Sequence, residues 1–424
     1  MQGRELEAER QDGEVVAVAG LCHDLGHGPF SHVFDSEFLP RRHGSSYNEH
    51  AWTHEDMSAQ MLEFLVDENH IETTRRGGDD LVGRVKALIT SGHSVGGGGG
   101  GGGAGRRCGY LREIVANGRN SVDVDKFDYI QRDCQNCGIK SSSDFGRLMQ
   151  YMKVIEDEIC FKASEVLNVY ELFHTRASLH QRVYSHRKAK AIEYMVVDAL
   201  VHADAAWGNE ISNAIWRAQD FVKLDDTVLK RIEWSEEAAL EPARALLRRL
   251  RRRELYRFVN EFTVPSERLD RWVDVKPQDI VSCQDAKGGR KLVAEDIIVH
   301  NLKIDWAMKN KNPVDSVHFY QDYSSDTKFT IPKEKVSLLI PDVFLERKVR
   351  VYSKSDLQED VAAVDAAFAA YQQREFQMVR QVGSTPLKAS RKRPLDLSGA
   401  GALGSQFEGG GGTPQSMPQG AAAE

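Results

Sequence analysis

The sequence predicts a mainly α-helical core, a smaller α+β C-terminal lobe and a disordered tail. The core is predicted by apolar residues that recur every three or four positions through 167–184 and 189–206, the period of an amphipathic helix. From Thr263 onward prolines become frequent, and short β-type runs such as 296–299 replace the helical pattern. After about Gln381 the chain is rich in Gly, Pro, Ser and Ala with few aromatic residues, a composition that cannot offset its ordering entropy.

The composition limits the classes of protein that this chain can represent. With 424 residues, at roughly 100–200 residues per domain, it is long enough for two to four domains. Its 56 basic and 63 acidic residues give a net charge of −7, which excludes a wholly basic nucleic-acid coat but not a local basic site. No window approaches the ~20 apolar residues that a membrane-spanning helix needs. A charged N-terminus without a secretory signal and only six cysteines predict a protein of a reducing compartment.

Shifts in composition divide the chain into five expected parts. An apolar run at 15–21 and helical patterns at 56–66 and 79–91 belong to the first part of the core, and a run of eight glycines at 96–103 interrupts it. An alanine-rich helical pattern at 355–376 ends the lobe. The expected division is therefore core 1–93, glycine-rich insertion 94–109, core 110–262, C-terminal lobe 263–380 and tail 381–424.

The densest chemical signal is a short string in which His23, Asp24, His27 and His32 fall within ten residues. Imidazole and carboxylate groups are good ligands for Zn²⁺, Fe²⁺ or Mn²⁺, and an adjacent His-Asp pair at a helix end can clasp one ion. The glycines and the proline within this string would stop the helix and leave room for substrate. The alternative is a helix end and turn that merely contain histidines, which fits any single histidine better than it fits the whole string.

Two further groups combine histidine, aspartate and tyrosine with helical spacing. His54 follows Thr53, a candidate helix N-cap, so its imidazole would lie in the first helical turn. Asp125, Tyr129 and Asp133 are spaced four residues apart and would share one face of a helix. Acids and a tyrosine on one stripe favour contact with a cation or a polar ligand. The alternatives are an ordinary surface histidine and a solvated acidic face.

The segment 174–188 is rich in cations. On a continuous helix, Arg176, His180 and Tyr184 form one stripe, and Arg182 and His186 form another, about 240° round the helix from Arg176. Guanidinium groups bind phosphate oxygens bidentately, so such a helix would suit two anionic ligands such as triphosphates. The alternative is a basic solvated helix, which most runs of this kind are.

Two weaker signals complete the survey. Five arginines at 248–253 lie in an amphipathic pattern, which indicates either a solvated face or contact with nucleic acid. Cys134 and Cys137 have zinc or redox spacing, but no second pair and no strand–helix context accompany them. We interpret them as ordinary cysteines.

Taken together, these motifs resemble the SAM-and-HD-domain dNTP triphosphohydrolase family. The string at 23–32 is the hallmark of HD-domain phosphohydrolases, and further family motifs follow in order at 52–55, 123–129, 174–186 and 309–315. The resemblance spans about 15–352 and is specific, because generic HD proteins share only the His-Asp pair and the distant aspartate. It implies a mainly α HD-domain core with a smaller mixed lobe. It also implies a metal-dependent hydrolase that cleaves dNTPs, dGTP among them, to deoxynucleoside and inorganic triphosphate and so regulates dNTP pools.

The resemblance further implies roles for particular residues of this sequence. A divalent metal ion (Zn, Fe, Mn or Mg) would be held by His23, Asp24 and Asp125, with His54 and His32 as catalytic residues. The implied substrate pocket comprises Lys126, Tyr129, Asp133, Arg176, His180 and Tyr184. GTP or a dNTP would bind an allosteric site that promotes assembly of a homotetramer, and that site comprises Arg147, Asn168, Arg182, His186 and Arg187.

The sequence departs from the family's pattern in three respects. It has no SAM domain, it carries the glycine insertion, and none of the 22 residues before His23 is a histidine, although the family places its first metal ligand on an upstream helix. We therefore expect either a chain that begins late or an enzyme of impaired activity. Two other functions stay open. One is an HD phosphohydrolase for cyclic nucleotides, guanosine tetraphosphate or nucleic-acid ends, and the other is a catalytically inactive protein that binds nucleotides or single-stranded nucleic acid.

The tail carries two short signals of its own. A basic cluster at 388–394 is the kind of patch that import receptors bind, and Thr385 just before it lies in a Thr-Pro-x-Lys pattern that proline-directed kinases favour. Phosphate on Thr385 would add nearly two negative charges beside that cluster. The sequence therefore predicts a nuclear protein, with the cytoplasm as the alternative.

Overall fold

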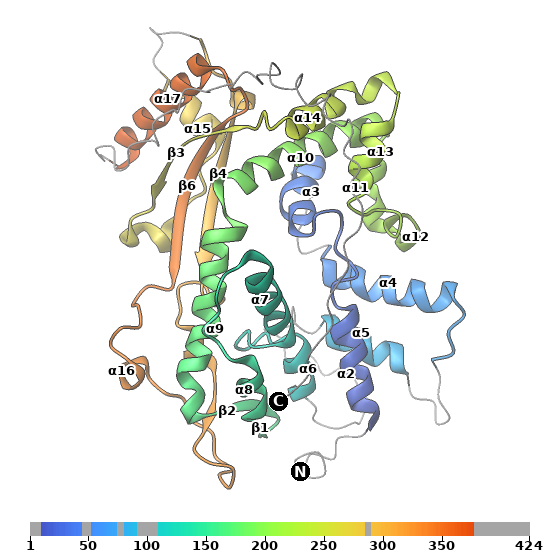
Figure 1. Ribbon diagram of the computed structural model, residues 1–424, viewed down its shortest axis with the longest axis vertical. Helices are drawn as coiled ribbons and strands as arrows, with labels where there is room; N and C mark the ends of the chain where they lie inside the picture. Colours follow the sequence, from blue (N-terminus) through green and yellow to red (C-terminus); the bar gives the residue numbers. More distant parts are fainter. Residues whose placement is uncertain (1–9, 45–51, 74–79, 91–108, 285–289, 377–424) are drawn as a thin grey trace, which may run out of the picture. The chain divides into compact units, whose positions relative to one another are not determined.

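The computed structural model describes residues 10–44, 52–73, 80–90, 109–284 and 290–376 (Figure 1). The glycine run at 96–103, the basic cluster at 388–394 and Thr385 lie outside the described residues. Within the described ranges, no helix combines the length and the apolar character that a membrane-spanning segment requires.

A first group of helices packs around the apolar run at 15–21 and comprises α2 (Arg10–Cys22), α4 (His54–Glu68), α5 (Leu81–Ile89), α6 (Gly109–Val115), α7 (Val124–Cys137), α8 (Phe145–Gln150) and α9 (Val166–Leu179). Val15 and Ala19 lie one turn apart on α2 and are buried in the same cluster as Val85 and Ile89 of α5. The helices predicted near 56–66 and 79–91 are confirmed as α4 and α5. Val15 and Ala19 of the early apolar run are thus buried by partners that come later in the chain, whereas Leu21 is exposed.

A second group of helices gathers around the longest helix of the core and comprises the π-helical turn η1 (Phe34–Phe38), α3 (Leu39–His43), α10 (Arg187–Ala206), α11 (Glu210–Asn213), α12 (Ala218–Phe221), α13 (Val228–Trp234) and α14 (Glu241–Arg251). The apolar face of α10 buries Val197 and Leu200 beside Phe34 and Phe38 of η1. The helical period predicted through 189–206 is therefore confirmed. The apolar face of α10 packs against η1, the turn that follows the His-Asp string.

A small sheet interrupts the helices where the sequence pattern predicts mostly helix. Strands β1 (Met152–Ile155) and β2 (Glu158–Lys162) form an antiparallel hairpin, and the two turn residues Glu156 and Asp157 both have positive φ. The two-residue strand β5 (Phe319–Tyr320) joins β2 in parallel, so it attaches a distant segment to the core.

The C-terminal lobe is built on an antiparallel sheet of order β3-β6-β4, with β3 at Arg257–Thr263, β4 at Ile297–Asp305 and β6 at Leu345–Ser353. Helices α15 (Pro277–Val281) and α17 (Gln358–Phe376) pack on it (Figure 1), and Val349 and Val351 are buried in the same cluster as Val364 and Phe368. The sheet begins at Arg257, ahead of the boundary expected at 263. A short helix, α16 (Lys333–Val336), and 3₁₀ turns at Ala163–Glu165, Ala214–Trp216, Ala238–Leu240, Ser266–Arg271, Ala294–Asp296 and Pro313–Ser316 complete the elements.

The continuous helix expected through 174–188 is wrong. Helix α9 ends at Leu179, the π-helical turn η5 (His180–Tyr184) follows, and α10 begins at Arg187. The Ser185 N–H donates to the His180 carbonyl at 2.9 Å, a spacing of five residues that widens the turn. The two stripes expected on one straight helix therefore do not exist in that form, and a bend separates Tyr184 from Arg187.

Candidate active site and metal-ligand group

The His-Asp string lies where α2 ends. His23 follows the last residue of α2, and its Nδ1 donates to the Gly20 carbonyl at 2.8 Å. This bond points Nε2 toward Asp24 Oδ1 at 3.4 Å and Asp125 Oδ1 at 3.6 Å. His23 Nε2 is buried and has no hydrogen-bond partner among the described residues. Two segments about a hundred residues apart in the chain thus present one imidazole and two carboxylates to one point.

This group of donors fits a divalent metal ion. The ligand atoms of His23, Asp24 and Asp125 lie within 4.8 Å of one another. The Asp125 carboxylate, together with Asp24, raises the pKa of His23 to about 9. Although burial raises the pKa of Asp125, contact with His23 holds it below the usual value. A divalent cation would compete with the His23 proton for the same nitrogen, and mixed imidazole and carboxylate donors suit Zn²⁺, Fe²⁺ or Mn²⁺.

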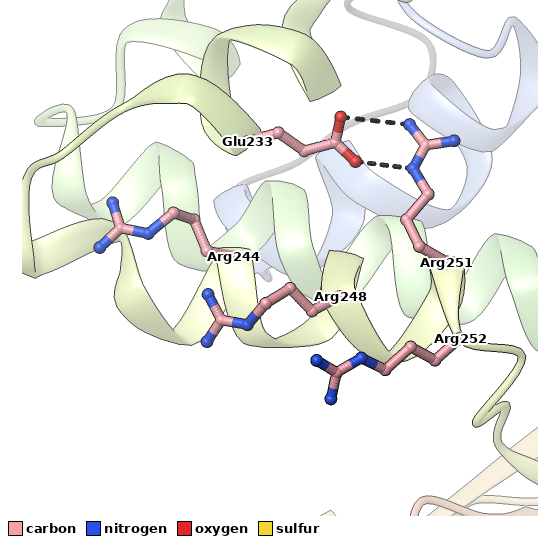
Figure 2. Close-up of a pocket in the computed structure, with 5 residues that line it drawn as sticks. All are labelled: Glu233, Arg244, Arg248, Arg251 and Arg252. Atoms are coloured by element: carbon pink, nitrogen blue, oxygen red, sulfur yellow. Dashed lines mark hydrogen bonds and ion pairs between the residues drawn. The ribbon is translucent and has the colours of Figure 1, made fainter.

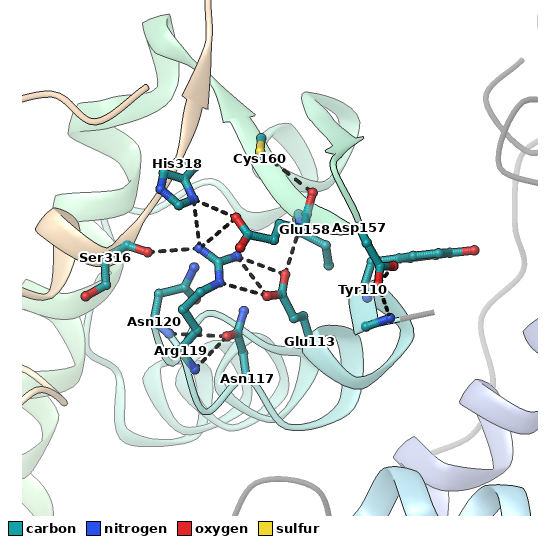
Figure 3. A network of polar contacts seen from close by, with 12 residues as sticks. Tyr110, Glu113, Asn117, Arg119, Asn120, Asp157, Glu158, Cys160, Ser316 and His318 are labelled. Atoms are coloured by element: carbon teal, nitrogen blue, oxygen red, sulfur yellow. Dashed lines mark hydrogen bonds and ion pairs between the residues drawn. The ribbon is translucent and has the colours of Figure 1, made fainter. Parts of the chain in front are cut away.

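The N-terminus of α7 is fixed by a tight loop that brings Asp125 to this point. Asp123 caps the helix by accepting from the Lys126 N–H at 3.2 Å, and it also accepts from the Asn117 N–H at 3.1 Å. Figure 3 shows the contacts that Arg119 of this loop makes with other parts of the chain. Its Nε and Nη2 donate to Glu113 of α6 at 2.8 and 3.0 Å, and its Nη1 donates to the Ser316 carbonyl at 3.1 Å. Three parts of the chain therefore determine the position of Asp125.

A second polar group adjoins the metal-ligand group. The rings of His27 and His54 stack at 4.0 Å, and His27 Nε2 lies 3.6 Å from Asp24 Oδ1. Asp35 Oδ2 lies between two histidines, 3.3 Å from His32 Nδ1 and 3.6 Å from His54 Nδ1. Burial raises the pKa of Asp35, but contacts with both histidines lower it well below its usual range, so the side chain is a carboxylate. The structure thus brings the predicted catalytic residues His32 and His54 together through an aspartate.

Sequence reasoning missed Asp35 as part of this site, and it gave His27 no role of its own within the string. Asp35 stands three residues after His32, a spacing that places both on one side of a helical turn. That spacing was the available signal, but η1 is a π-helical turn, and nothing local in the sequence predicts its geometry.

The His-Asp string packs on α4 through a contact that only glycine permits. The Gly26 N–H donates to Ser58 Oγ at 2.8 Å, and Ser58, which is fully buried, lies 2.6 Å from the His23 carbonyl. A Cβ atom at Gly26 would stand 2.1 Å from the His54 carbonyl oxygen. The predicted cap of α4 is confirmed, because Thr53 Oγ1 accepts from the Asp56 N–H at 3.1 Å. The string and the first turn of α4 are therefore held in direct backbone contact.

The predicted helical face on α7 is confirmed, and it meets the segment that follows α9. Tyr184 donates to Asp133 Oδ2 at 2.5 Å, and the rings of Tyr129 and Tyr184 are 6.4 Å apart. Arg176 Nη1 donates to the Asp305 carbonyl at 2.7 Å, whereas its Nε is buried without a partner among the described residues. Burial raises the pKa of Tyr129 to about 12. Asp125 lies on the same α7 face, so this wall is continuous with the metal-ligand group.

The two remaining residues expected to line the substrate pocket, His180 and Lys126, differ in charge. His180 lies 5.0 Å from Tyr184 between ring centres, and burial, followed by the charge of Arg176, lowers the pKa of His180 to about 4. Lys126 Nζ lies 3.3 Å from Asp123 Oδ1, so its charge is paired with the cap of α7. Among the residues expected to line the pocket, His180 therefore presents a neutral imidazole and Arg176 a guanidinium.

The residues expected for the allosteric site fall into two separate groups. Arg147 donates through Nε to both oxygens of Glu165 at 2.8 Å, and Asn168 contacts the same carboxylate at 3.4 Å. Arg187 donates to Glu261 at 2.5 Å, while Arg182 and His186 are exposed. Asn168 is in the first turn of α9 and Arg182 follows its end, so the two groups are separated by about 20 Å along the helix. One chain does not bring them together.

The basic run at 248–253 contributes to a hollow of about 290 Å³ on α13 and α14, lined by Glu233, Arg244, Arg248, Arg251 and Arg252 (Figure 2). Arg251 pairs with Glu233 at 2.7 Å, and Glu241 pairs with Arg244 and Arg248. Three of the four lining arginines thus pair with a carboxylate, but the two carboxylates balance only half of the charge of the four arginines. Cys134 is buried and Cys137 is exposed, and both are free thiols, which agrees with their interpretation as ordinary cysteines.

Comparison with known proteins places these motifs in a family context. Residues 1–73 match the HD domain, and residues 143–304 match the HD associated region. The Dictyostelium discoideum deoxynucleoside triphosphate triphosphohydrolase SAMHD1 homolog is 42% identical over 365 residues, which cover 86% of this chain and 66% of that protein. The Bos taurus deoxynucleoside triphosphate triphosphohydrolase SAMHD1 is 33% identical over 419 residues, which cover 93% of this chain and 70% of that protein. The Homo sapiens protein of the same name is 35% identical over 377 residues, which cover 82% of this chain and 59% of that protein. The chain spans 59–70% of the length of these three relatives.

Proposed function

This chain belongs to the SAMHD1 family of deoxynucleoside triphosphate triphosphohydrolases, and we propose that it hydrolyses dNTPs, dGTP among them, to a deoxynucleoside and inorganic triphosphate. The observation that carries the proposal is the meeting of His23, Asp24 and Asp125 at one point beside the His27–His54 stack. Such an activity would lower dNTP pools.

The residues around this point suit a triphosphate ester. A divalent cation on the three donors would lower the pKa of water and polarise a phosphoryl oxygen. Arg176 Nη1 donates to the Asp305 carbonyl, so other N–H groups of this guanidinium remain for a phosphate oxygen. The neutral ring of His180 beside Tyr184 would form an uncharged side of the pocket. The arrangement would place the phosphates toward Arg176 and the metal-ligand group.

Hydrolysis at the α-phosphorus breaks its bond to the 5′ oxygen of the deoxyribose, and that oxygen must gain a proton. His54 and His32 are the candidate donors, since both adjoin the metal-ligand group and contact Asp35. A carboxylate on Nδ1 fixes the ring orientation and stabilises the imidazolium form, so Nε2 would be the proton-donating atom. Asp35 therefore supports the proposed acid in the way that the third member of a catalytic triad does.

We also propose that GTP or a dNTP regulates the protein by joining copies of the chain. The expected allosteric residues form one group on Glu165 and another near Glu261, which lie too far apart along α9 for one nucleotide on one chain. A nucleotide held between neighbouring copies would contact both groups. Sedimentation velocity with and without dGTP tests this, and normal nucleotide-driven assembly of Arg182→Ala would contradict it.

The hydrolase proposal is tested by product analysis on the purified chain supplied with Mn²⁺. We expect deoxynucleoside and triphosphate in equal amounts from dGTP, and no release of single phosphates. Asp125→Asn should reduce turnover and bound metal by more than the ~10–100-fold that loss of an outer hydrogen bond to a metal ligand costs. Asp128→Asn is the matched control, because this exposed aspartate lies on the same helix and pairs only with Arg132 among the described residues.

Other outcomes would redirect the proposal. Release of orthophosphate, or turnover of cyclic nucleotides or guanosine tetraphosphate instead of dNTPs, would assign a different HD phosphohydrolase activity. Binding of dGTP without any product, in the presence of Mn²⁺, would assign a nucleotide-binding protein without catalysis.

A further inference from the structure

The turn that carries His180 and Tyr184 is held from behind by the C-terminal sheet. Arg350 lies in the middle of β6, directly opposite Glu261 on β3 and His300 on β4. Its side chain is buried, and Nη1 donates to the carbonyl of Ser185, the residue that closes the π-helical turn η5. Arg350 therefore reaches from the lobe to the backbone that follows Tyr184.

Glu261 holds this arginine in place. Arg350 Nε donates to Glu261 Oε2 at 2.6 Å, and the other carboxylate oxygen accepts from Arg187 at 2.5 Å. Both guanidinium groups act against burial and keep the pKa of Glu261 below its usual value. The guanidinium fork of Arg350 thus spans a partly buried carboxylate on one side and a backbone carbonyl on the other, a geometry that a lysine ammonium cannot reproduce.

Two other side chains, His300 and Tyr352, lie close to Arg350, and neither is an anion at neutral pH. His300 pairs with Arg350 in the sheet and lies near Lys190 of α10, and burial together with these two charges lowers the pKa of His300 to about 3. The imidazole is therefore neutral and leaves Glu261 as the anion that orients Arg350.

The bonds of η5 make this anchor relevant to the proposed substrate pocket. The Ser185 N–H donates to the His180 carbonyl at 2.9 Å, and the His186 N–H donates to the Val183 carbonyl at 3.0 Å. When the Ser185 peptide is fixed, the wide turn is fixed, and with it the hydroxyl of Tyr184 that donates to Asp133. A π-helical turn is a rare geometry that needs support from its surroundings.

We propose that Arg350 is a positioning residue that, held by Glu261, keeps the turn His180–Tyr184 in the form that binds substrate. The proposal rests on the proposed function in one respect, namely that His180 and Tyr184 contact the dNTP. Arg350 itself is 6% exposed and lies behind the turn, so it does not touch the substrate.

The test uses Arg350→Lys, Glu261→Gln and the double variant in the full chain. The matched control is Arg290→Lys, because Arg290 likewise pairs with a carboxylate of the lobe, that of Asp360, at 2.6 Å, but among the described residues it has no contact with η5. Hydrogen–deuterium exchange of peptides that cover 180–187 reports the turn directly. We expect exchange there to quicken at least about tenfold in Arg350→Lys and to stay unchanged in Arg290→Lys. The double variant should add little to the larger single effect, because the two residues act as a unit.

The kinetic readout separates positioning from catalysis. If the competent form of the turn falls to about one tenth of the population, KM for dGTP rises about tenfold while kcat at saturation stays near the wild-type value. A fall in kcat without a change in KM would overturn the positioning role. Unchanged exchange at 180–187, with melting lowered as in Arg290→Lys, would also overturn it, because Arg350 would then only stabilise the lobe. If the wild-type chain does not hydrolyse dGTP, the proposed function fails alone, and the exchange result still decides the role of Arg350.

Discussion

Gly26→Ala tests the contact on which the candidate site depends. Gly26 lies between His23 and Asp24, the proposed metal ligands, and the stacked His27, and its backbone touches the first turn of α4. An added Cβ would stand 2.1 Å from the His54 carbonyl oxygen and 2.3 Å from the Ser58 nitrogen. Both neighbours are backbone atoms of a helix, so no side-chain rotation can relieve the clash.

The size of the effect follows from these distances. The contact must open from 2.1 Å to at least 3.4 Å, a shift of about 1.3 Å between the His-Asp string and α4. This shift would break the bond from the Gly26 N–H to Ser58, now 2.8 Å, and leave buried polar groups unpaired at about 1–3 kcal/mol each. We therefore expect a loss of about 2–4 kcal/mol in the free energy of unfolding. A displacement of about 1 Å in catalytic groups also costs about 100-fold in turnover.

The measurements are thermal unfolding, bound metal by mass spectrometry and triphosphate release from dGTP. Gly13→Ala is the matched control, because Gly13 is on α2 and a Cβ there meets nothing within 4 Å. It should raise stability by about 0.5–1 kcal/mol, since alanine is the better helix former, and leave metal content unchanged. Wild-type stability and metal content in Gly26→Ala would refute the close packing of the string on α4.

Two further variants test charged groups, Asp35 in the candidate site and His300 in the C-terminal sheet. Asp35→Asn keeps the shape of the side chain but removes the charge that supports His54, so kcat for dGTP should fall roughly 10–150-fold, equivalent to about 1.5–3 kcal/mol. The exposed Asp56→Asn in the same region should have little effect, and equal losses in both would contradict the role of Asp35. His300→Gln tests a pH effect: the folded pKa of His300 is about 3, against about 6.5 in the unfolded chain, so acid protonates the unfolded state first. Stability should therefore fall below pH 6.5, by about 2 kcal/mol at pH 5, and urea unfolding of His300→Gln should lack that part of the loss.

The sequence predicts the ligand types of the site because their chemistry is local. His23 and Asp24 are adjacent, and Asp125, Tyr129 and Asp133 follow a period that only one helix face can satisfy. Thr53 was predicted as a cap for the same reason, since its hydroxyl acts on a backbone N–H three residues later. The hairpin β1–β2 was harder to predict, because three apolar residues in a row, 159–161, break the alternation that is typical of a half-buried strand.

The π-helical turns account for the main errors. A helical period of 3.6 residues predicts stripes only while the helix continues, and one extra residue in a turn rotates every side chain that follows. For this reason Arg182 and His186 do not form the stripe expected on a continuous helix, because η5 ends at Tyr184. Asp35 lies in the other π-helical turn, η1, and the helical pattern did not identify it. In both places the wide turn is stabilised by packing against distant parts of the chain, which a local pattern does not contain.

The residues that position the site share a property that explains why no motif reveals them. Ser58 contacts the His23 carbonyl, Arg119 the Ser316 carbonyl and Arg350 the Ser185 carbonyl. Every residue offers a carbonyl, so the identity of the partner carries no information about the contact, whereas a metal ligand must be one of a few side chains. Metal ligands are therefore recognisable from sequence alone, but their supports become visible only when the fold brings a donor to a backbone oxygen far away in the chain. The same reasoning predicts that such a contact tolerates a change of the residue that offers the carbonyl but not a change of the donor. Ser185→Ala should therefore leave hydrogen–deuterium exchange in η5 unchanged, whereas Arg350→Lys should quicken it.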